Sequence, residues 1–202
     1  MAGKSFFMHK NSAGLCTNSL HKSALLFCNK QVDSLKSFET QRLILRQIDE
    51  SWSEEVLQYY DRNRHFLSDW EPKRSEEFYT LDFQRNFLQE DFKANESGKI
   101  LRLWVTSKND KRKIIGCITF NLIVRGVLQS CILGYKLDKD EINKGLITEG
   151  IKRAIDVVFD EVKLHRIEAP ILPINTASIK VVSKLGFENE GLSKKYIKVN
   201  GK

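Results

Sequence analysis

Two strand-to-helix junctions carry the residues whose types and spacing suit ligand binding. In "DEINKGLITEG" (140–150), Gly145 stands just before a helical pattern. The first N–H groups of a helix have no intrahelical partner and carry partial positive charge, and a glycine lets a phosphate approach the backbone. The predicted phosphate site is Gly145 with the amides of Leu146, Ile147 and Thr148. One glycine is a weak signal, and a plain helix start capped by Asn143 or Thr148 explains this stretch as well.

A second junction lies in "INTASIKVVSKLGF" (174–187). Asn175 follows an apolar run and is well placed to cap the next helix. Capping alone accounts for Asn175. Two small, polar junctions that lie side by side would hold the two ends of one extended ligand, so a combined cap and ligand contact stays open as the alternative.

The elements that must position these junctions follow from hydrophobic periodicity. Helical spacing predicts helices over 49–63, 75–98, 147–163 and 175–187, and alternation predicts strands over 38–49, 100–108, 113–126, 128–140, 165–173 and 192–199. The order is a strand, two helices, a three-strand meander, and then helix, strand, helix, strand. This order predicts the α/β class, with a mostly antiparallel sheet and one crossover.

Charge and composition limit the classes of function. The formal net charge is +7, of which residues 1–37, with five lysines and one acid, contribute +4. The remaining +3 is not the footprint of a dedicated nucleic-acid binder, so no direct nucleic-acid binding is expected. No apolar run approaches the roughly 18 residues of a membrane-spanning helix. We expect one domain over 38–202 and a weakly ordered extension over 1–37, with a short helix near 20–28.

The four cysteines show neither the spacing of a metal site nor that of a disulfide framework. Cys117 and Cys131 fall inside apolar, strand-like runs, which predicts buried free thiols. Free thiols fit a reducing compartment, so we expect a cytoplasmic protein without a metal.

Four further stretches, taken in order, resemble one known family. They are "NRHFLSDWEP" (63–72), "IIGCITFNLIVRG" (114–126), "LGY" (133–135) followed by "NKGLITEG" (143–150), and "LHRIEAPILPINTASIKVVSKLGFENEG" (164–191). Together they resemble the GNAT acetyltransferases, which use acetyl-CoA, and within them the branch of ribosomal-protein alanine N-acetyltransferases. The resemblance covers about 38–202.

The resemblance implies a splayed sheet, with acetyl-CoA between the strand ending near Leu137 and the strand ending near Pro173. The cofactor-binding residues that it implies are Leu137, Asn143, Lys144, Gly145, Leu146, Ile147, Thr148, Asn175 and Ser178. It assigns Arg64, Trp70, Glu71 and Arg125 to the acceptor cleft. Two of these have plain structural alternatives, since Trp70 also fits a core position and Arg125 a solvated hairpin tip.

The sequence departs from the family pattern in a few places. Ile147 stands where the family has a small residue, Ile142 stands where it has Gln or Arg, and Val182 replaces a tyrosine that many relatives use as general acid. The chain also stops at "VNGK", where the family continues with Trp-x-Asp and one more strand. That last strand is therefore expected to be missing, which leaves "KKYIKV" (194–199) without a partner.

The expected reaction is attack of a neutral amine on a thioester, with a backbone N–H of 133–137 stabilising the oxyanion. Glu168 is the candidate general base, and a surface carboxylate paired with Arg166 or His165 is the alternative. Tyr135 lines the site near the thioester or packs. Ser183 donates a proton to the leaving thiolate if its helix faces the sulfur, and is a solvated helix position otherwise.

Three functions fit these residues. The first is acetylation of the N-terminal α-amine of a protein, perhaps a ribosomal one, because α-amines have pKa values of about 7.7–8.0 and need a weaker base than lysine at about 10.4. The second is acetylation of a small amine, such as a polyamine, amino sugar or amino acid. The third is a non-catalytic CoA-binding or ribosome-associated module.

Overall fold

The computed structural model describes residues 2–10, 35–196 and 200, and these residues form one α/β domain. The strands are β1 (Gly3–His9), β2 (Ser37–Glu39), β3 (Leu43–Arg46), β4 (Leu101–Ser107), β5 (Ile114–Val124), β6 (Ser130–Leu137), β7 (Arg166–Ile171) and β8 (Glu188–Ser193). The helices are α1 (Ser53–Ser68), α2 (Leu81–Glu96), α3 (Leu146–Val157) and α4 (Thr176–Lys184). Short helical turns lie at Glu50–Trp52, Glu76–Tyr79 and Lys139–Glu141, and a π-helical turn, Val158–Val162, continues α3.

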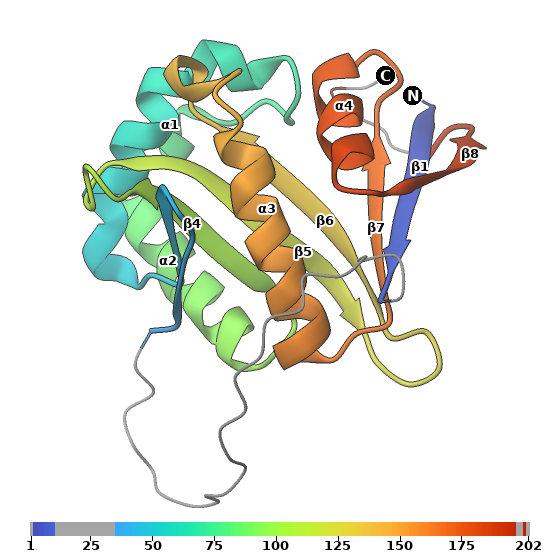
Figure 1. Cartoon of the computed structure of the whole chain (residues 1–202). Helices are drawn as coiled ribbons and strands as arrows, with labels where there is room; N and C mark the ends of the chain where they lie inside the picture. Colours follow the sequence, from blue (N-terminus) through green and yellow to red (C-terminus); the bar gives the residue numbers. More distant parts are fainter. Residues whose placement is uncertain (1, 11–34, 197–199, 201–202) are drawn as a thin grey trace, which may run out of the picture.

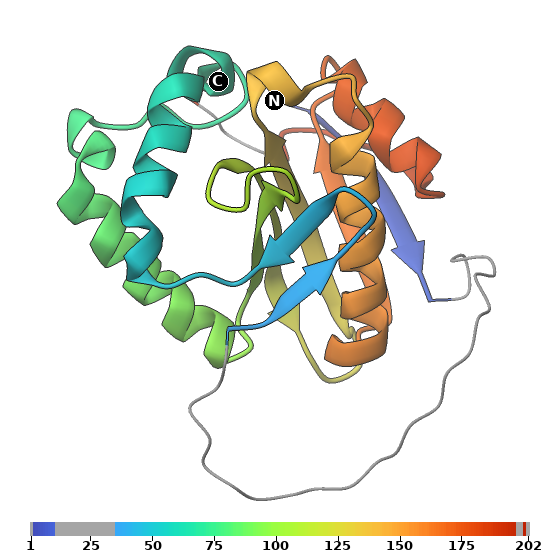
Figure 2. The same cartoon turned by 60° about the vertical axis from the view of Figure 1, so that its left-hand side comes forward.

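The strands form a single sheet in the order β2-β3-β4-β5-β6-β7-β1-β8. Its neighbouring strands run antiparallel except for β6 and β7, which are parallel. Helices α1 and α2 cover one face, and α3 and α4 cover the other (Figure 1 and Figure 2). The predicted class, a mostly antiparallel sheet flanked by helices, is therefore confirmed. The sheet has two crossovers instead of the one expected, because α3 joins the parallel strands β6 and β7, and α4 joins β7 to β8 past β1.

Two apolar layers hold the helices to the sheet because side chains alternate between its faces. Along β4, Leu103 and Val105 join the layer beneath α3 and α4, whereas Trp104 joins the layer beneath α1 and α2. The predicted free thiols are confirmed for both described cysteines, since Cys117 and Cys131 are buried and unpaired. Burial raises the pKa of Cys131 to about 12 and also raises that of Cys117, so both thiols stay protonated.

The structure corrects two strand predictions. The single strand expected over 38–49 is a hairpin of β2 and β3, because Thr40 and its neighbours reverse the chain and pair Phe38 with Leu45. The last strand, β8, covers Glu188–Ser193 and overlaps the strand expected over 192–199 only at its first two residues, because 194 and 195 form a turn; 197–199 lie outside the described residues. The short helix expected near 20–28 lies outside the described residues.

The N-terminus also differs from the expectation. Residues 3–9, assigned to a weakly ordered extension, form β1 in the sheet between β7 and β8. The physical reason is burial of Phe6 and Met8, which leave only 3% and 2% of their surfaces exposed. Strand β8 pairs with β1, whereas the stretch expected to lack a partner, 194–199, forms no strand in its described residues, 194–196.

Two features are absent from the described residues. No helix among them has both the length and the apolar character needed to cross a membrane. No three of their His, Cys, Asp or Glu side chains gather closely enough to hold a metal ion.

Candidate active site

Strands β6 and β7 separate partway along their length, and the candidate site lies where they part. They share three residue pairs, which join Ser130 to Arg166, Cys131 to Ile167 and Ile132 to Glu168. From Leu133 to Leu137, the edge of β6 that faces β7 pairs with no strand among the described residues. The chain leaves β6 toward α3 and leaves β7 toward α4, so both helices begin at this open end of the sheet (Figure 1).

The start of α3 has the geometry of an anion site. Gly145 adopts a left-handed conformation with φ of 75°, and no side chain caps the first N–H groups. Asn143 is also left-handed, with φ of 61°, a conformation that asparagine tolerates better than most residues. The alternative in which Asn143 or Thr148 caps this helix is therefore wrong, and the first N–H groups, those of Leu146, Ile147 and Thr148, receive no side-chain cap.

A network that the sequence did not reveal fixes this helix start. Glu149 accepts hydrogen bonds from the hydroxyl of Thr40 at 2.6 Å and from the Arg42 backbone at 2.8 Å, and pairs with the Arg42 guanidinium at 2.7 Å. Arg42 also donates to the Lys144 carbonyl at 3.0 Å. Because 107 positions separate Arg42 from Glu149, only the folded chain brings them together. The network ties the β2–β3 turn to the loop before α3.

The start of α4 is capped as predicted. The Asn175 side chain accepts a hydrogen bond from the Ser178 backbone at 3.0 Å. The hydroxyl of Tyr135 on β6 donates to the Ser178 carbonyl at 3.0 Å, so it links β6 to α4 across the separated strands. Burial raises the pKa of Tyr135 to about 12, which keeps this donor protonated. Ser183 is exposed near the other end of α4.

Glu168 lies on β7 in the last residue pair before the strands part. Its carboxylate accepts a hydrogen bond from the Arg166 guanidinium at 3.0 Å, and Arg166 also pairs with Glu190 on β8. The structure thus contains the ion pair with Arg166 that was the alternative for Glu168. The Glu168 side chain is 33% exposed and lies beside the point where the strands part.

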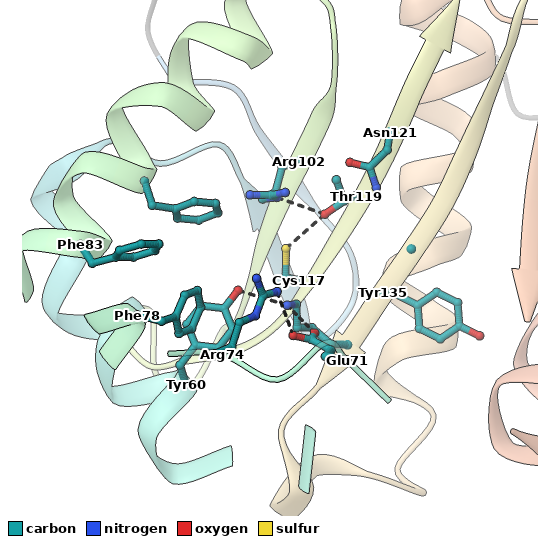
Figure 3. A pocket seen from close by; sticks show the side chains of 13 residues that line it. Tyr60, Glu71, Arg74, Phe78, Phe83, Arg102, Cys117, Thr119, Asn121 and Tyr135 are labelled. Atoms are coloured by element: carbon teal, nitrogen blue, oxygen red, sulfur yellow. Dashed lines mark hydrogen bonds and ion pairs between the residues drawn. The ribbon is translucent and has the colours of Figure 1, made fainter. Parts of the chain in front are cut away.

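A cavity of about 420 Å³ lies on the opposite face of the sheet, between α1, α2 and the strands β5 and β6. Phe78, Phe83 and Phe87 form an aromatic wall, and Glu71, Arg74 and Lys136 supply charge. Figure 3 shows the aromatic rings facing Arg74 and Glu71, whereas the ring of Tyr135 points away from them. The cavity also reaches Gly134 on β6, so it borders the strand that opens toward β7.

Glu71 and Lys136 form the central charge pair of this cavity. The Lys136 ammonium donates to the Glu71 carboxylate at 2.6 Å and to the Tyr60 hydroxyl at 3.1 Å, and Arg74 lies 3.3 Å from the other carboxylate oxygen. Burial raises the pKa of Glu71, but the charges of Lys136 and Arg74 outweigh it and bring the pKa below its ordinary 4.5. Lys136 was missed, although a lone lysine in the apolar strand "CILGYKL" was the available signal.

The other residues assigned to the acceptor cleft are dispersed. Arg64 pairs with Glu76 and stacks over the Tyr79 ring at 4.1 Å, in a shallow depression that shares Glu71 with the cavity. Trp70 is 40% exposed and does not line the cavity. Arg125 donates to the Val162 carbonyl at 2.6 Å, so it binds the end of the helix that continues α3 rather than the cavity.

Comparison with known proteins decides the family. The acetyltransferase (GNAT) domain matches residues 42–188, a span that includes both helix starts and the cavity. The chain is a GNAT acetyltransferase. It is therefore an acetyl-CoA-dependent N-acetyltransferase, and the splayed strands agree with the sheet that the resemblance predicted.

Three relatives of this GNAT acetyltransferase are informative. The [ribosomal protein uS5]-alanine N-acetyltransferase of Escherichia coli (strain K12) is 34% identical over 80% of this chain and 83% of the relative. The crystal structure of ribosomal-protein-S5-alanine acetyltransferase from Vibrio fischeri has a TM-score of 0.77 and 36% identity, covering 82% of this chain and 90% of that one. Mycobacterium smegmatis RimJ, solved with CoA-disulfide, has a TM-score of 0.73 and 25% identity, covering 79% and 76%.

The charge pair predicts a pH-dependent contribution to stability. Because the folded-state pKa of Glu71 lies below 4.5, its ionised form stabilises the fold above that pH, and this contribution is lost as pH falls through the folded pKa. We expect Glu71→Gln to lower the free energy of unfolding by about 1–3 kcal/mol at pH 7, since it leaves Lys136 unpaired. The difference from wild type should shrink below pH 4.5, as measured by urea unfolding.

Glu76→Gln is the matched control. Glu76 also pairs with an arginine, but its side chain is 83% exposed, so its removal should not change the unfolding midpoint measurably. Equal effects of the two substitutions would contradict the role given to Glu71.

Proposed function

We propose that this GNAT acetyltransferase acetylates the N-terminal α-amine of a protein in the cytoplasm, and that the protein is a ribosomal one. The observation that carries the proposal is the cavity between α1 and α2, where Glu71, the one carboxylate among the described residues that line it, is held by two cations. A carboxylate held in this way is a poor base, so the site suits an amine that is already partly neutral. The names of the relatives from Escherichia coli and Vibrio fischeri, which act on ribosomal proteins, support the choice of acceptor.

The two helix starts and the unpaired edge of β6 are the proposed cofactor site. Uncapped N–H groups after Gly145 suit a pyrophosphate, while Asn175 and Ser178 face the other arm of the ligand. Leu137, Asn143 and Lys144 border the same region, with the Leu137 side chain itself buried. Acetyl-CoA supplies the acetyl thioester.

The transfer requires three functions from the protein. A backbone N–H on the free edge of β6 would stabilise negative charge on the carbonyl oxygen as the C–N bond forms and the C–S bond breaks. Glu168, directly or through a water, would accept the proton of the amine. The leaving thiolate takes up a proton from solvent, because the Tyr135 hydroxyl is committed to the Ser178 carbonyl and Ser183 is exposed.

A small-molecule amine is the second candidate acceptor, and the size of the cavity favours it. A volume of about 420 Å³ lies within the range of small-molecule sites, so a whole amino acid or amino sugar would fit. The two acceptors differ in one respect: a protein acceptor has residues after the first that can contribute to binding, and a small amine has none.

An acceptor panel tests the proposed function. We expect release of free CoA with decapeptides that begin with alanine and match ribosomal protein N-termini. We expect no release when the α-amine of the same peptides is formylated, even if the peptide contains a lysine whose side-chain amine is still free. Faster turnover of free amino acids or polyamines than of the open peptides would overturn the protein acceptor and support the small-amine reading.

A pair of glycines tests the phosphate site. Gly145 and Gly126 have nearly equal φ values, 75° and 72°, so an alanine at either position incurs similar backbone strain. We expect Gly145→Ala to weaken acetyl-CoA binding about tenfold in calorimetry, because the strained loop presents its N–H groups less well. Gly126→Ala, in the β5–β6 loop, should bind as wild type does. Equal affinities would contradict the site.

Two carboxylates on one arginine test the general base. Glu168 and Glu190 both pair with Arg166, so each substitution by glutamine removes one partner of the same ion pair. If Glu168 accepts the proton, Glu168→Gln should lower kcat about 100-fold or more. Glu190→Gln should leave kcat within a few-fold of wild type. Similar losses in both would indicate a structural ion pair.

A further inference from the structure

Strand β8 is connected to the sheet through one neighbour. It is the last strand in the sheet order, and within the described part of the chain it pairs with β1 alone. Strand β1 pairs in turn with β7, so it fills the position between two strands that α4 joins along the chain (Figure 1). A segment from the far N-terminus therefore completes the half of the domain that carries α4.

Strand β1 pairs with a strand on each side and buries two of its side chains in the core. It forms six residue pairs with β7, from Lys4 with Ile171 to His9 with Arg166, and five with β8. Phe6 and Met8 lie in the same buried cluster as Val182 of α4 and the adjoining Phe187. Met8 also lies beside the turn after α4, because a Cβ atom on Gly186 would contact its terminal methyl group at 3.9 Å. Removal of the two side chains would leave a void in the apolar layer to which α4 belongs.

Helix α4 also belongs to the candidate cofactor site. Its first turn carries the Asn175 cap and the Ser178 carbonyl that receives the Tyr135 hydroxyl. The helix is therefore held at its start by β6 and along its buried side by the layer to which β1 contributes. A shift of α4 would change the distance between the two helix starts.

We propose that β1 is a positioning element of the acetyl-CoA site, although it lies outside the family match at 42–188. The slot between β7 and β8 binds residues 3–9 as a separable strand, and its occupancy holds β8 and α4 in the cofactor-binding arrangement. The segment is separable in sequence because residues 10–36 lie between β1 and β2. The proposal rests on the assignment of acetyl-CoA to the starts of α3 and α4.

The test uses the full chain with Phe6 and Met8 both replaced by serine, and Lys4→Gln as the matched control on the same strand. Hydrogen exchange followed by mass spectrometry should show protection lost in β8 and α4 and kept in β4 and β5, because the opening is local. Acetyl-CoA affinity, measured by calorimetry, should fall at least tenfold in the double variant and stay unchanged in the control.

A synthetic peptide of residues 2–10 provides the decisive arm. Added to the double variant, it should restore both the protection of α4 and the affinity, whereas a peptide with serine at both apolar positions should restore neither. Unchanged protection and affinity in the double variant would overturn the proposal. So would loss of protection throughout the sheet, since β1 would then belong to the folding core rather than position α4.

The exchange measurement separates this inference from the proposed function. If the wild-type chain fails to bind acetyl-CoA, the cofactor site is wrong, yet the protection of β8 and α4 still reports whether β1 holds them. If the wild-type chain binds and the double variant binds equally well, the cofactor site stands and the positioning role of β1 fails.

Discussion

Parallel pairing between β6 and β7 ends after three residue pairs, and the chemistry of this domain depends on where it ends. Backbone groups on a strand edge need partners, so an edge left open from Leu133 to Leu137 can pair with an extended ligand. The helices that follow both strands begin at this open end, and their N-termini contribute partial positive charge there. One interruption in a sheet thus creates both a hydrogen-bonding edge and two anion-attracting ends.

Two charge pairs lie near this opening, one on each face of the sheet. On the α3 side, Arg42 and Glu149 satisfy each other and leave the helix N–H groups available. On the opposite face, Glu71 and Lys136 satisfy each other within an aromatic cavity. Despite burial, hydrogen bonds and charges from the partners hold the pKa of Glu71 and of Glu149 below the ordinary 4.5, and removal of Glu71 would leave the charge of Lys136 poorly solvated. The proposed site would therefore receive an anionic co-substrate from one side and an amine from the other.

Strand β1, from the N-terminus, supplies the neighbour that β8 needs at the edge of the sheet. An extended β8 without a neighbour would expose a row of unpaired backbone groups. The N–H and C=O groups of residues 3–9 pair with β7 and β8, and the side chains of Phe6 and Met8 are buried in the core. The same pairing draws the N-terminus into the half of the molecule that holds α4, so a segment distant in sequence acts on the geometry of the site.

The sequence alone determined most of the elements, their order, the buried thiols, the Asn175 cap and the family, because periodicity, capping and ordered motifs are local properties. Local motifs also identified Gly145 as a candidate for the cofactor site and Glu71 as a candidate for the acceptor cleft. Only the tertiary structure decided that β1 belongs to the sheet, that Arg42 locks Glu149, that Lys136 pairs with Glu71, and that Arg125 binds a helix end instead of the cavity. The residues in these contacts lie between 37 and more than 160 positions apart in the sequence. Such pairings depend on which buried charges and strand edges still lack a partner once the chain has folded.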